Sequence, residues 1–247
     1  MNIYVTKNPR ELGKLAALRI ANLLRDTIRE KGSARLLLST GASQFETISH
    51  LVKEKVDWHK VEMFHLDEYV GLPEKHKASF RAYLKKRFTS KVKLKAAHFI
   101  NGEGDVNAII TMLNKEIAKA PVDVGVIGIG ENAHIAFNDP PADFKAKKSY
   151  IIVKLDKKCK QQQVREGWFK IEADVPPTAI TISPYAIMKC HHIISSVPFT
   201  VKAEAIQNTL TKKVSPDVPA SILKTHPDWH LYLDTESASK VFPFTLV

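Results

Sequence analysis

Segments with the residue spacing of helices alternate with short apolar segments along most of the chain. A helix is predicted over 11–31, where apolar residues recur every three or four positions up to Gly32. The leucines at 36–38 then predict a strand that is buried on both faces. Strands that alternate with helices are typical of a mostly parallel sheet covered by helices on both faces.

The same alternation predicts the remaining elements. Strands are expected at 35–39, 61–65, 122–129, 150–155, 179–183, 192–197 and 229–234, and helices at 43–55, 79–88, 106–118, 184–190 and 201–210. Because no internal repeat or low-complexity linker interrupts the pattern, residues 1–247 are interpreted as a single α/β domain with a Rossmann-like sheet. Ligands bind such sheets beyond the carboxyl ends of the strands, so functional residues are expected in the loops that follow strands.

The charge balance favours an anionic partner. The chain has 37 Lys and Arg against 26 Asp and Glu, a net charge of +11. The lysines are spread over many segments, and neither an arginine-rich tail nor an RNA-binding aromatic motif is present. We therefore expect a diffuse basic surface suited to an anionic small molecule, and no nucleic-acid partner.

Cysteine use and hydropathy bear on the cellular setting. Cys159 and Cys190 have no metal-like spacing and do not suggest a disulfide scaffold. Residues 1–5 show no signal-peptide pattern, and no apolar run approaches the ~20 residues of a membrane span. We expect a cytoplasmic, reducing setting and no membrane partner, and the sequence leaves a homo-oligomer open.

The first unusual loop is STGAS at 39–43, between a predicted strand and a predicted helix. Its glycine can adopt backbone angles closed to other residues, and the N–H groups at a helix start suit a phosphate. The loop lacks the Gly-Lys-Ser/Thr ending of a Walker motif. It is either a plain turn with Ser43 as the N-cap or a phosphate-binding loop formed by Thr40, Gly41, Ala42 and Ser43.

The second loop is HLDEYVGLP at 65–73, which places two adjacent carboxylates directly after a strand. A carboxylate screened from water at a strand end can act as a general base. Adjacent residues of an extended chain point to opposite sides, so only one of Asp67 and Glu68 is expected to face a site. The alternative is a solvated acidic turn.

The third loop is GIGENAHIAFNDPP at 128–141. Its first six residues match G-x-G-x-x-A, a weak form of the dinucleotide-binding fingerprint. That fingerprint needs a helix directly after it, and Pro140-Pro141 stops any helix within a few residues. We therefore expect no nicotinamide cofactor.

His134 is the most reactive side chain of this third loop, and it lies near Asn132 and Asp139 in the sequence. A carboxylate beside an imidazole fixes its orientation and favours its protonated form, which suits proton transfer near neutral pH. The alternative is a structural histidine bonded to the backbone. No metal is expected, because a zinc-ligand spacing is absent among His65, His134, His191 and His192.

Together the loops resemble those of a known family. Residues 65–73 and 128–140 are similar in composition, order and separation to the two signature loops of glucosamine-6-phosphate deaminases/isomerases, and 39–43 lies at that family's phosphate-contacting loop. The resemblance runs from about residue 8 to 240. The related 6-phosphogluconolactonases share the fold and a Gly-His loop but lack the HLDEYVGLP segment.

The resemblance implies conversion of glucosamine 6-phosphate and water to fructose 6-phosphate and ammonia, with no metal or redox cofactor. His134 would open the sugar ring, and Asp67 would move a proton from C2 to C1. Lys202 and the 39–43 loop would hold the phosphate of this sugar-phosphate substrate. Two alternatives remain: a lactonase or an isomerase without deamination on the same fold, and a non-catalytic sugar-phosphate sensor.

The chain departs from the family pattern in the histidine loop. It has Asn132 and Ala133 where the best-known members have Asp and Gly, and Asp139 where they have Glu. Asn132 cannot stabilise an imidazolium by charge, and the shorter Asp139 is expected to need a water or a shift to contact the histidine. Arg165 lies near the position of the family's phosphate-binding arginine, or is instead an exposed helix residue.

Overall fold

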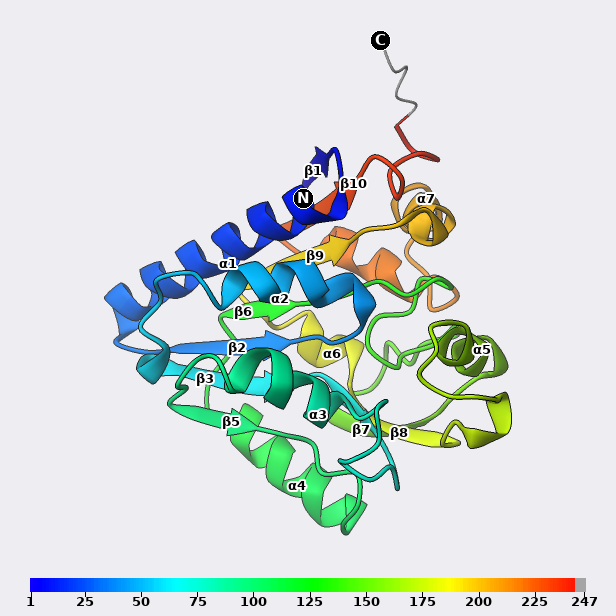
Figure 1. The fold of residues 1–247 in the computed structure, drawn as a ribbon, viewed down its shortest axis with the longest axis horizontal. Coiled ribbons are helices and arrows are strands. Elements are labelled where there is room, and N and C mark those ends of the chain that lie inside the picture. Colours follow the sequence, from blue (N-terminus) through cyan, green and yellow to red (C-terminus); the bar gives the residue numbers. More distant parts are fainter. Residues whose placement is uncertain (243–247) are drawn as a thin grey trace.

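The fold is built on a seven-stranded sheet, shown in Figure 1. The computed structural model describes residues 1–242, and 243–247 lie outside the described residues. The strand order is β1-β10-β9-β6-β2-β3-β5, and every neighbouring pair is parallel. The strands are β1 (Asn2–Thr6), β2 (Ala34–Leu38), β3 (Val61–His65), β5 (Ala96–His98), β6 (Val124–Val126), β9 (His192–Val197) and β10 (Trp229–Asp234). The predicted mostly parallel sheet is confirmed.

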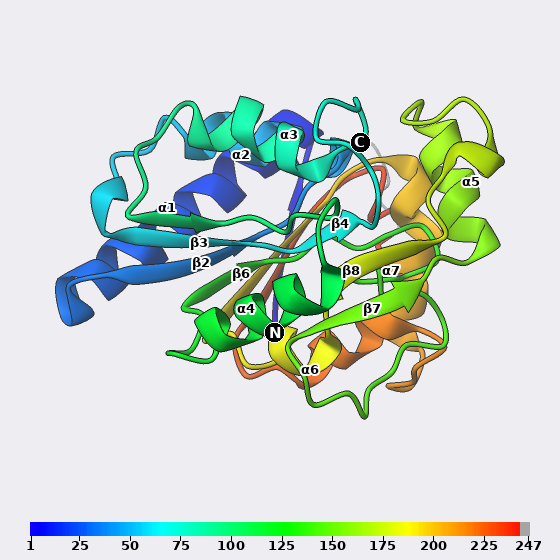
Figure 2. The same ribbon diagram turned by 90° about the horizontal axis from the view of Figure 1, so that it is seen from below.

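Helices cover both faces of this sheet, as predicted (Figure 2). One face carries α1 (Pro9–Lys31), α2 (Phe45–Leu51) and α3 (Phe80–Leu84), and the other carries α4 (Val106–Ile117), α6 (Pro184–Ile187) and α7 (Ala203–Thr211). Each face has its own apolar core because parallel strands bury both sides. Among residues 1–242, no helix has the length and apolar character needed to cross a membrane.

A second, three-stranded sheet lies beside the first. It pairs β4 (Asp67–Tyr69) with β8 (Thr178–Ile182) and β8 with β7 (Tyr150–Lys154), both antiparallel. The strands expected at 150–155 and 179–183 therefore exist, but they are not part of the parallel sheet. The burial of β7 alternates along the strand, and a half-exposed strand of this kind suits an antiparallel pair.

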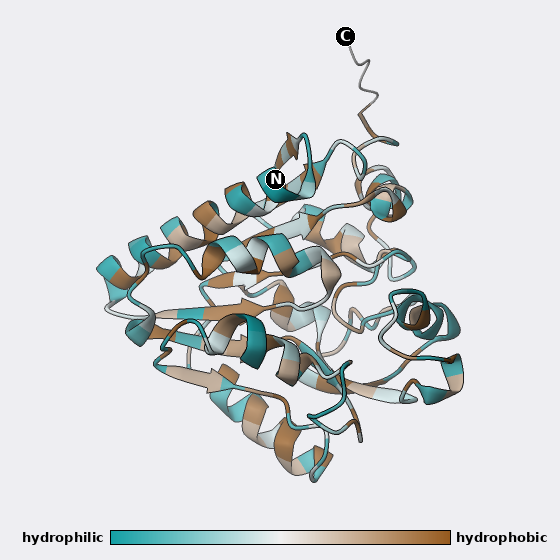
Figure 3. Ribbon diagram, in the orientation of Figure 1, coloured by the Kyte–Doolittle hydropathy of each residue, from teal (hydrophilic) through white to brown (hydrophobic). Residues whose placement is uncertain are grey.

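Some elements were not predicted. β1, β4, β5 and the helix α5 (Lys157–Arg165) carry too short or too polar a pattern, and β6 is shorter than the 122–129 strand expected. α5 consists mainly of lysine and glutamine and is largely hydrophilic in Figure 3. Its start is fixed by a cap rather than by apolar spacing, because Asp156 Oδ1 accepts a hydrogen bond of 2.6 Å from the backbone N–H of Cys159.

Candidate active site

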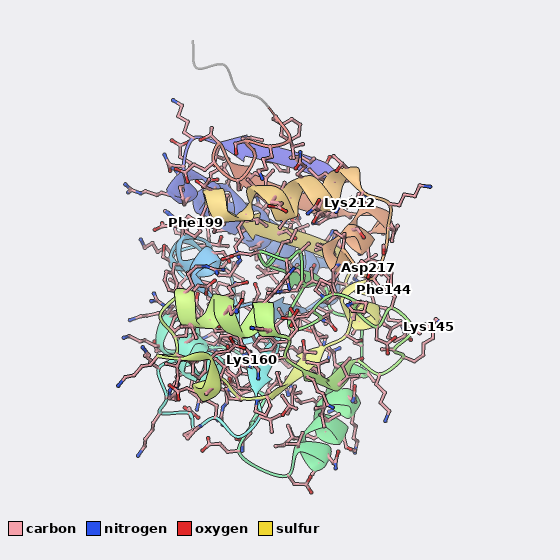
Figure 4. All side chains as sticks on the ribbon, turned by 90° about the vertical axis from the view of Figure 1, so that its right-hand side faces the viewer. Phe144, Lys145, Lys160, Phe199, Lys212 and Asp217 are labelled. Carbon is pink, nitrogen blue, oxygen red and sulfur yellow. The ribbon has the colours of Figure 1, made fainter. Side chains whose placement is uncertain are left out.

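A pocket of about 260 Å³ lies beyond the carboxyl ends of four neighbouring strands, β9, β6, β2 and β3, whose arrows point to the right in Figure 1. From β2 the chain continues to β3 and β5 on one side of the sheet, and from β6 it continues to β9 and β10 on the other side. The pocket therefore lies at a switch in strand order. Figure 4 looks onto this side, with α5 toward the viewer and the lining residue Phe199 labelled at the upper left. Of the residues predicted from sequence, the lining includes Thr40, Gly41, Ala42, Ser43, Asp67, His134, Arg165 and Lys202.

The 39–43 loop and Lys202 both line the pocket. Gly41 has a φ of +96°, a conformation that favours glycine, and its carbonyl accepts a hydrogen bond of 3.0 Å from the Tyr83 hydroxyl. Lys202 is 5% exposed, and its ammonium group makes no hydrogen bond or ion pair within residues 1–242. Burial lowers the pKa of Lys202. A buried cation without a protein partner is suited to an anionic ligand.

Arg165 also lines the pocket, from the last turn of α5. Its guanidinium group forms an ion pair with Glu131, and its side chain is 57% exposed. The two interpretations of this arginine from sequence are therefore compatible, since it is both an exposed helix residue and a pocket residue. The position places two cations, Arg165 and Lys202, in one pocket wall.

Asp67 opens the second sheet and faces the pocket. Its side chain is 5% exposed and accepts no hydrogen bond from any residue of the 1–242 segment. Burial raises the pKa of Asp67 well above its ordinary value, and the neighbouring Glu68 carboxylate raises it further. A desolvated carboxylate with free lone pairs is a competent proton acceptor.

Glu68 points the other way, as the alternation of an extended chain predicts. Its carboxylate is fully buried and accepts hydrogen bonds at the start of α3, from Ser79 Oγ at 2.9 Å and from the backbone N–H groups of Phe80 and Arg81 at 3.2 and 2.8 Å. It also accepts one of 3.0 Å from the N–H of Tyr69. Glu68 therefore holds β4 against α3, and burial raises its pKa despite these bonds.

His134 belongs to a network of three side chains, together with Asn132 and Asp139. Its Nδ1 lies 2.7 Å from Asn132 Oδ1, and that oxygen also accepts the His134 backbone N–H at 3.1 Å. The Asn132 amide group donates to Asp139 Oδ1 at 3.1 Å. Because this donation fixes the amide orientation, Nδ1 must carry the proton, and neutral His134 presents its lone pair at Nε2.

Asp139 contacts His134 directly. Its Oδ1 lies 3.2 Å from Nδ1, so the expectation that the shorter side chain needs a water or a shift is wrong. The compact turn between the two residues brings the aspartate close enough, with Ala136 at a φ of +51°. Burial raises the pKa of Asp139, but the contacts with His134 and Asn132 outweigh it, and the net pKa is lowered.

Two backbone features shape this loop. A Cβ at Gly130 would lie 2.2 Å from His134 Nε2, so the imidazole ring occupies the space that a side chain would fill. Ala133 has a φ of +64°, where the family pattern has glycine, and such a conformation costs an alanine about 1–2 kcal/mol. The main chain of Ala133 is held by a 2.9 Å hydrogen bond from Ala220.

Several pocket residues were missed from sequence, above all Gln163 and Trp168 on or after α5, and Glu131. For Gln163 and Trp168 the only available signal was their position near Arg165, because the helix itself was not predicted, whereas Glu131 lies in the 128–141 loop that the sequence had singled out. Within residues 1–242, no three His, Cys, Asp or Glu side chains are grouped as metal ligands.

Comparison with known proteins identifies the family. The family model described as glucosamine-6-phosphate isomerases/6-phosphogluconolactonase matches residues 7–231. The chain belongs to this family. Within the isomerase/lactonase family, a glucosamine-6-phosphate deaminase of Bacillus cereus (strain B4264) is 32% identical over 240 residues, which are 97% of this chain and 88% of that protein.

Solved structures of the isomerase/lactonase family agree with the fold. A monomeric glucosamine-6-phosphate deaminase has a TM-score of 0.87 and 29% identity, covering 97% of this chain and 100% of its own. A 6-phosphogluconolactonase of Trypanosoma brucei has a TM-score of 0.79 at 15% identity over 98% of both chains, a likeness of fold alone. The resemblance inferred from the signature loops is therefore confirmed.

Proposed function

We propose that this family member is a glucosamine-6-phosphate deaminase that converts glucosamine 6-phosphate and water to fructose 6-phosphate and ammonia. The observation that carries the proposal is the Asp67 carboxylate, which faces the pocket without a protein donor and shares it with His134. Both the 32% identity to a deaminase and the intact HLDEYVGLP segment support this activity over the lactonase alternative.

The first step is opening of the sugar ring. The Nε2 lone pair of His134 accepts the proton of the C1 hydroxyl, and the resulting imidazolium returns it to the ring oxygen. Asp139 stabilises this transient cation through the 3.2 Å contact with Nδ1, and Asn132 keeps the ring oriented. The product is an open-chain aldehyde, in which the C2 proton is acidic.

The second step is proton transfer by Asp67. The carboxylate removes the C2 proton, and the C1 carbonyl oxygen gains a proton as the C2 ammonium group loses one, which gives an enolamine. Delivery of the C2 proton to C1 then leaves a hydroxyl group on C1 and an iminium group at C2. Water adds to that carbon, and ammonia leaves. The substrate ammonium group is a cation that favours the ionised form of Asp67 on binding, against the effect of burial.

Another part of the pocket binds the phosphate in this proposal. Thr40, Gly41, Ala42 and Ser43 supply N–H and hydroxyl groups, and Lys202 and Arg165 supply charge. Binding energy from the phosphate is then available to position the reacting carbons. The family match over 7–231 supports a single domain across 1–247, of which 243–247 lie outside the described residues. The cytoplasmic setting stays a prediction.

The test is ammonia release from a panel of sugar phosphates. We expect equal amounts of ammonia and fructose 6-phosphate from glucosamine 6-phosphate, and no hydrolysis of 6-phosphogluconolactone. Lactone hydrolysis without ammonia release would instead assign the lactonase reaction. Tight binding of glucosamine 6-phosphate without any turnover would assign a sensor.

Replacing Lys202 by methionine, which keeps the aliphatic stem, is expected to raise KM about 10–100-fold, since a charge-assisted hydrogen bond contributes about 1.5–3 kcal/mol. Folding disfavours the buried ammonium, whose pKa is lowered, so the variant should be at least as resistant to urea as the wild type at neutral pH. The exposed Lys212, labelled in Figure 4, provides the matched control Lys212→Met. An unchanged KM would remove Lys202 from phosphate binding.

A further inference from the structure

Gln163 is a buried pocket residue that the proposed reaction does not use. It lies on α5, is 5% exposed and lines the pocket. Its Oε1 accepts a hydrogen bond of 2.8 Å from the Tyr69 hydroxyl, whereas its Nε2 donates to no group within residues 1–242. The Nε2 group is not one of the fully buried unpartnered atoms of the described chain, so it is open to the pocket and available to donate to a ligand hydroxyl.

Tyr69 fixes the direction of this amide. Its ring is fully buried and packs against Phe80, Phe137 and Phe169, with ring centroids 5.1–5.4 Å apart. Burial also raises the pKa of Tyr69, which favours the protonated hydroxyl that donates this hydrogen bond. Because that hydroxyl occupies Oε1, the two N–H bonds of Gln163 are directed away from the aromatic cluster.

The position of Tyr69 relates Gln163 to the substrate. Asp67 and Tyr69 are two residues apart in β4, so their side chains leave the same face of the strand. Gln163, which Tyr69 contacts, and Asp67 therefore line the pocket beside the same face of β4, and the proposed function assigns the phosphate to Lys202 and the 39–43 loop. A sugar phosphate that spans these two regions places its C3 and C4 hydroxyl groups between them.

We propose that Gln163 is a specificity-determining residue, whose Nε2 donates a hydrogen bond to the C3 or C4 hydroxyl of the bound open-chain sugar phosphate, with Tyr69 as its positioning residue. The inference rests on the proposed function for the orientation of the substrate. Gln163 distinguishes sugar phosphates by one hydroxyl group, because a site with an oriented donor rejects a ligand that leaves the donor unpaired.

The test is a binding cycle that needs no turnover. Calorimetry would compare glucitol 6-phosphate with its 3-deoxy and 4-deoxy analogues in the wild type and in Gln163→Leu. One deoxy analogue is expected to bind the wild type about 10-fold more weakly than glucitol 6-phosphate. Gln163→Leu should bind glucitol 6-phosphate about 10-fold more weakly than the wild type does. In this variant the deoxy analogue and glucitol 6-phosphate should have similar dissociation constants.

Two further variants separate recognition from folding. Gln161→Leu changes an exposed glutamine of the same helix and should behave like the wild type. Tyr69→Phe keeps the buried ring and should reduce the hydroxyl discrimination. A purely structural role would lower the melting temperature and weaken all three ligands equally.

The proposal is overturned if the affinity of each deoxy analogue relative to glucitol 6-phosphate is the same in the wild type and in Gln163→Leu. It is also overturned if none of the three ligands binds. If the ligands show the expected hydroxyl discrimination but no ammonia is released from glucosamine 6-phosphate, only the proposed deaminase reaction is overturned.

Discussion

Replacing Asp67 by asparagine is expected to lower kcat for glucosamine 6-phosphate by about 10²–10⁴-fold, the usual contribution of a general base. The amide keeps the shape of the carboxylate but cannot accept the C2 proton. Because Asp67 accepts no hydrogen bond within residues 1–242, the change leaves no protein donor unpaired. Ammonia release measures turnover, and loss of deuterium from C2-labelled substrate measures the proton-transfer step directly.

The same variant is expected to be more stable than the wild type at neutral pH. Folding raises the pKa of Asp67 above its unfolded value, so the ionised carboxylate opposes folding at higher pH. The gain in urea midpoint should shrink as the pH falls toward the ordinary pKa of aspartate, where the carboxyl is protonated in both states. Full turnover by a folded Asp67→Asn protein would remove Asp67 from the mechanism.

Replacing Glu68 by glutamine is expected to cost about 3–5 kcal/mol of the free energy of unfolding, as for the loss of one partner from a buried ionic network. The carboxylate accepts four hydrogen bonds, and the amide nitrogen of glutamine would face donors instead of accepting from them. Urea denaturation of the variant measures this loss. A midpoint equal to that of the wild type would contradict the role assigned to Glu68.

Glu68→Gln should also change the pH dependence of catalysis. The Glu68 charge is the second cause, after burial, of the raised pKa of Asp67. The acidic limb of kcat/KM reports the protonation of the base, so it should shift to lower pH in the variant. Exposed Glu103→Gln, which lies outside the pocket lining, is the control and should leave the limb unchanged.

The fold was predictable where apolar periodicity was strong. The leucines of β2 and the apolar positions of α1 predicted the correct elements, because the buried positions of parallel strands and amphipathic helices are apolar and recur at a recognisable spacing. α5 was missed because it buries Cys159, Gln162 and Gln163 rather than an apolar stripe. The antiparallel pairing of β7 with β8 depends on contacts between residues 24 to 32 positions apart, from Lys154 with Thr178 to Tyr150 with Ile182, which no local pattern encodes.

The loops of the candidate site were predictable, and so were Lys202 and Arg165, whereas other lining residues such as Gln163 and Trp168 were not. Asp67 and His134 follow strands of the parallel sheet, and the carboxyl ends of neighbouring strands meet. The orientation of the histidine could not be read from sequence, because it depends on the direction of the Asn132 amide. The direct Asp139 contact depends on a tight turn whose positive φ angle falls on an alanine rather than a glycine.

The proposed base Asp67 lies in one sheet and His134 lies in a loop that follows the other, and this division has a consequence for how new specificities can arise. Asp67 lies in the small antiparallel sheet, while His134 and the 39–43 loop follow strands of the large one. Only Leu66 separates β3 from β4, and its carbonyl accepts a 2.9 Å hydrogen bond from Ile182. Substitutions that repack this junction would change the reach between base and phosphate loop while leaving each intact. Directed evolution toward phosphorylated sugars of other chain lengths therefore has a natural starting point at Leu66 and Ile182.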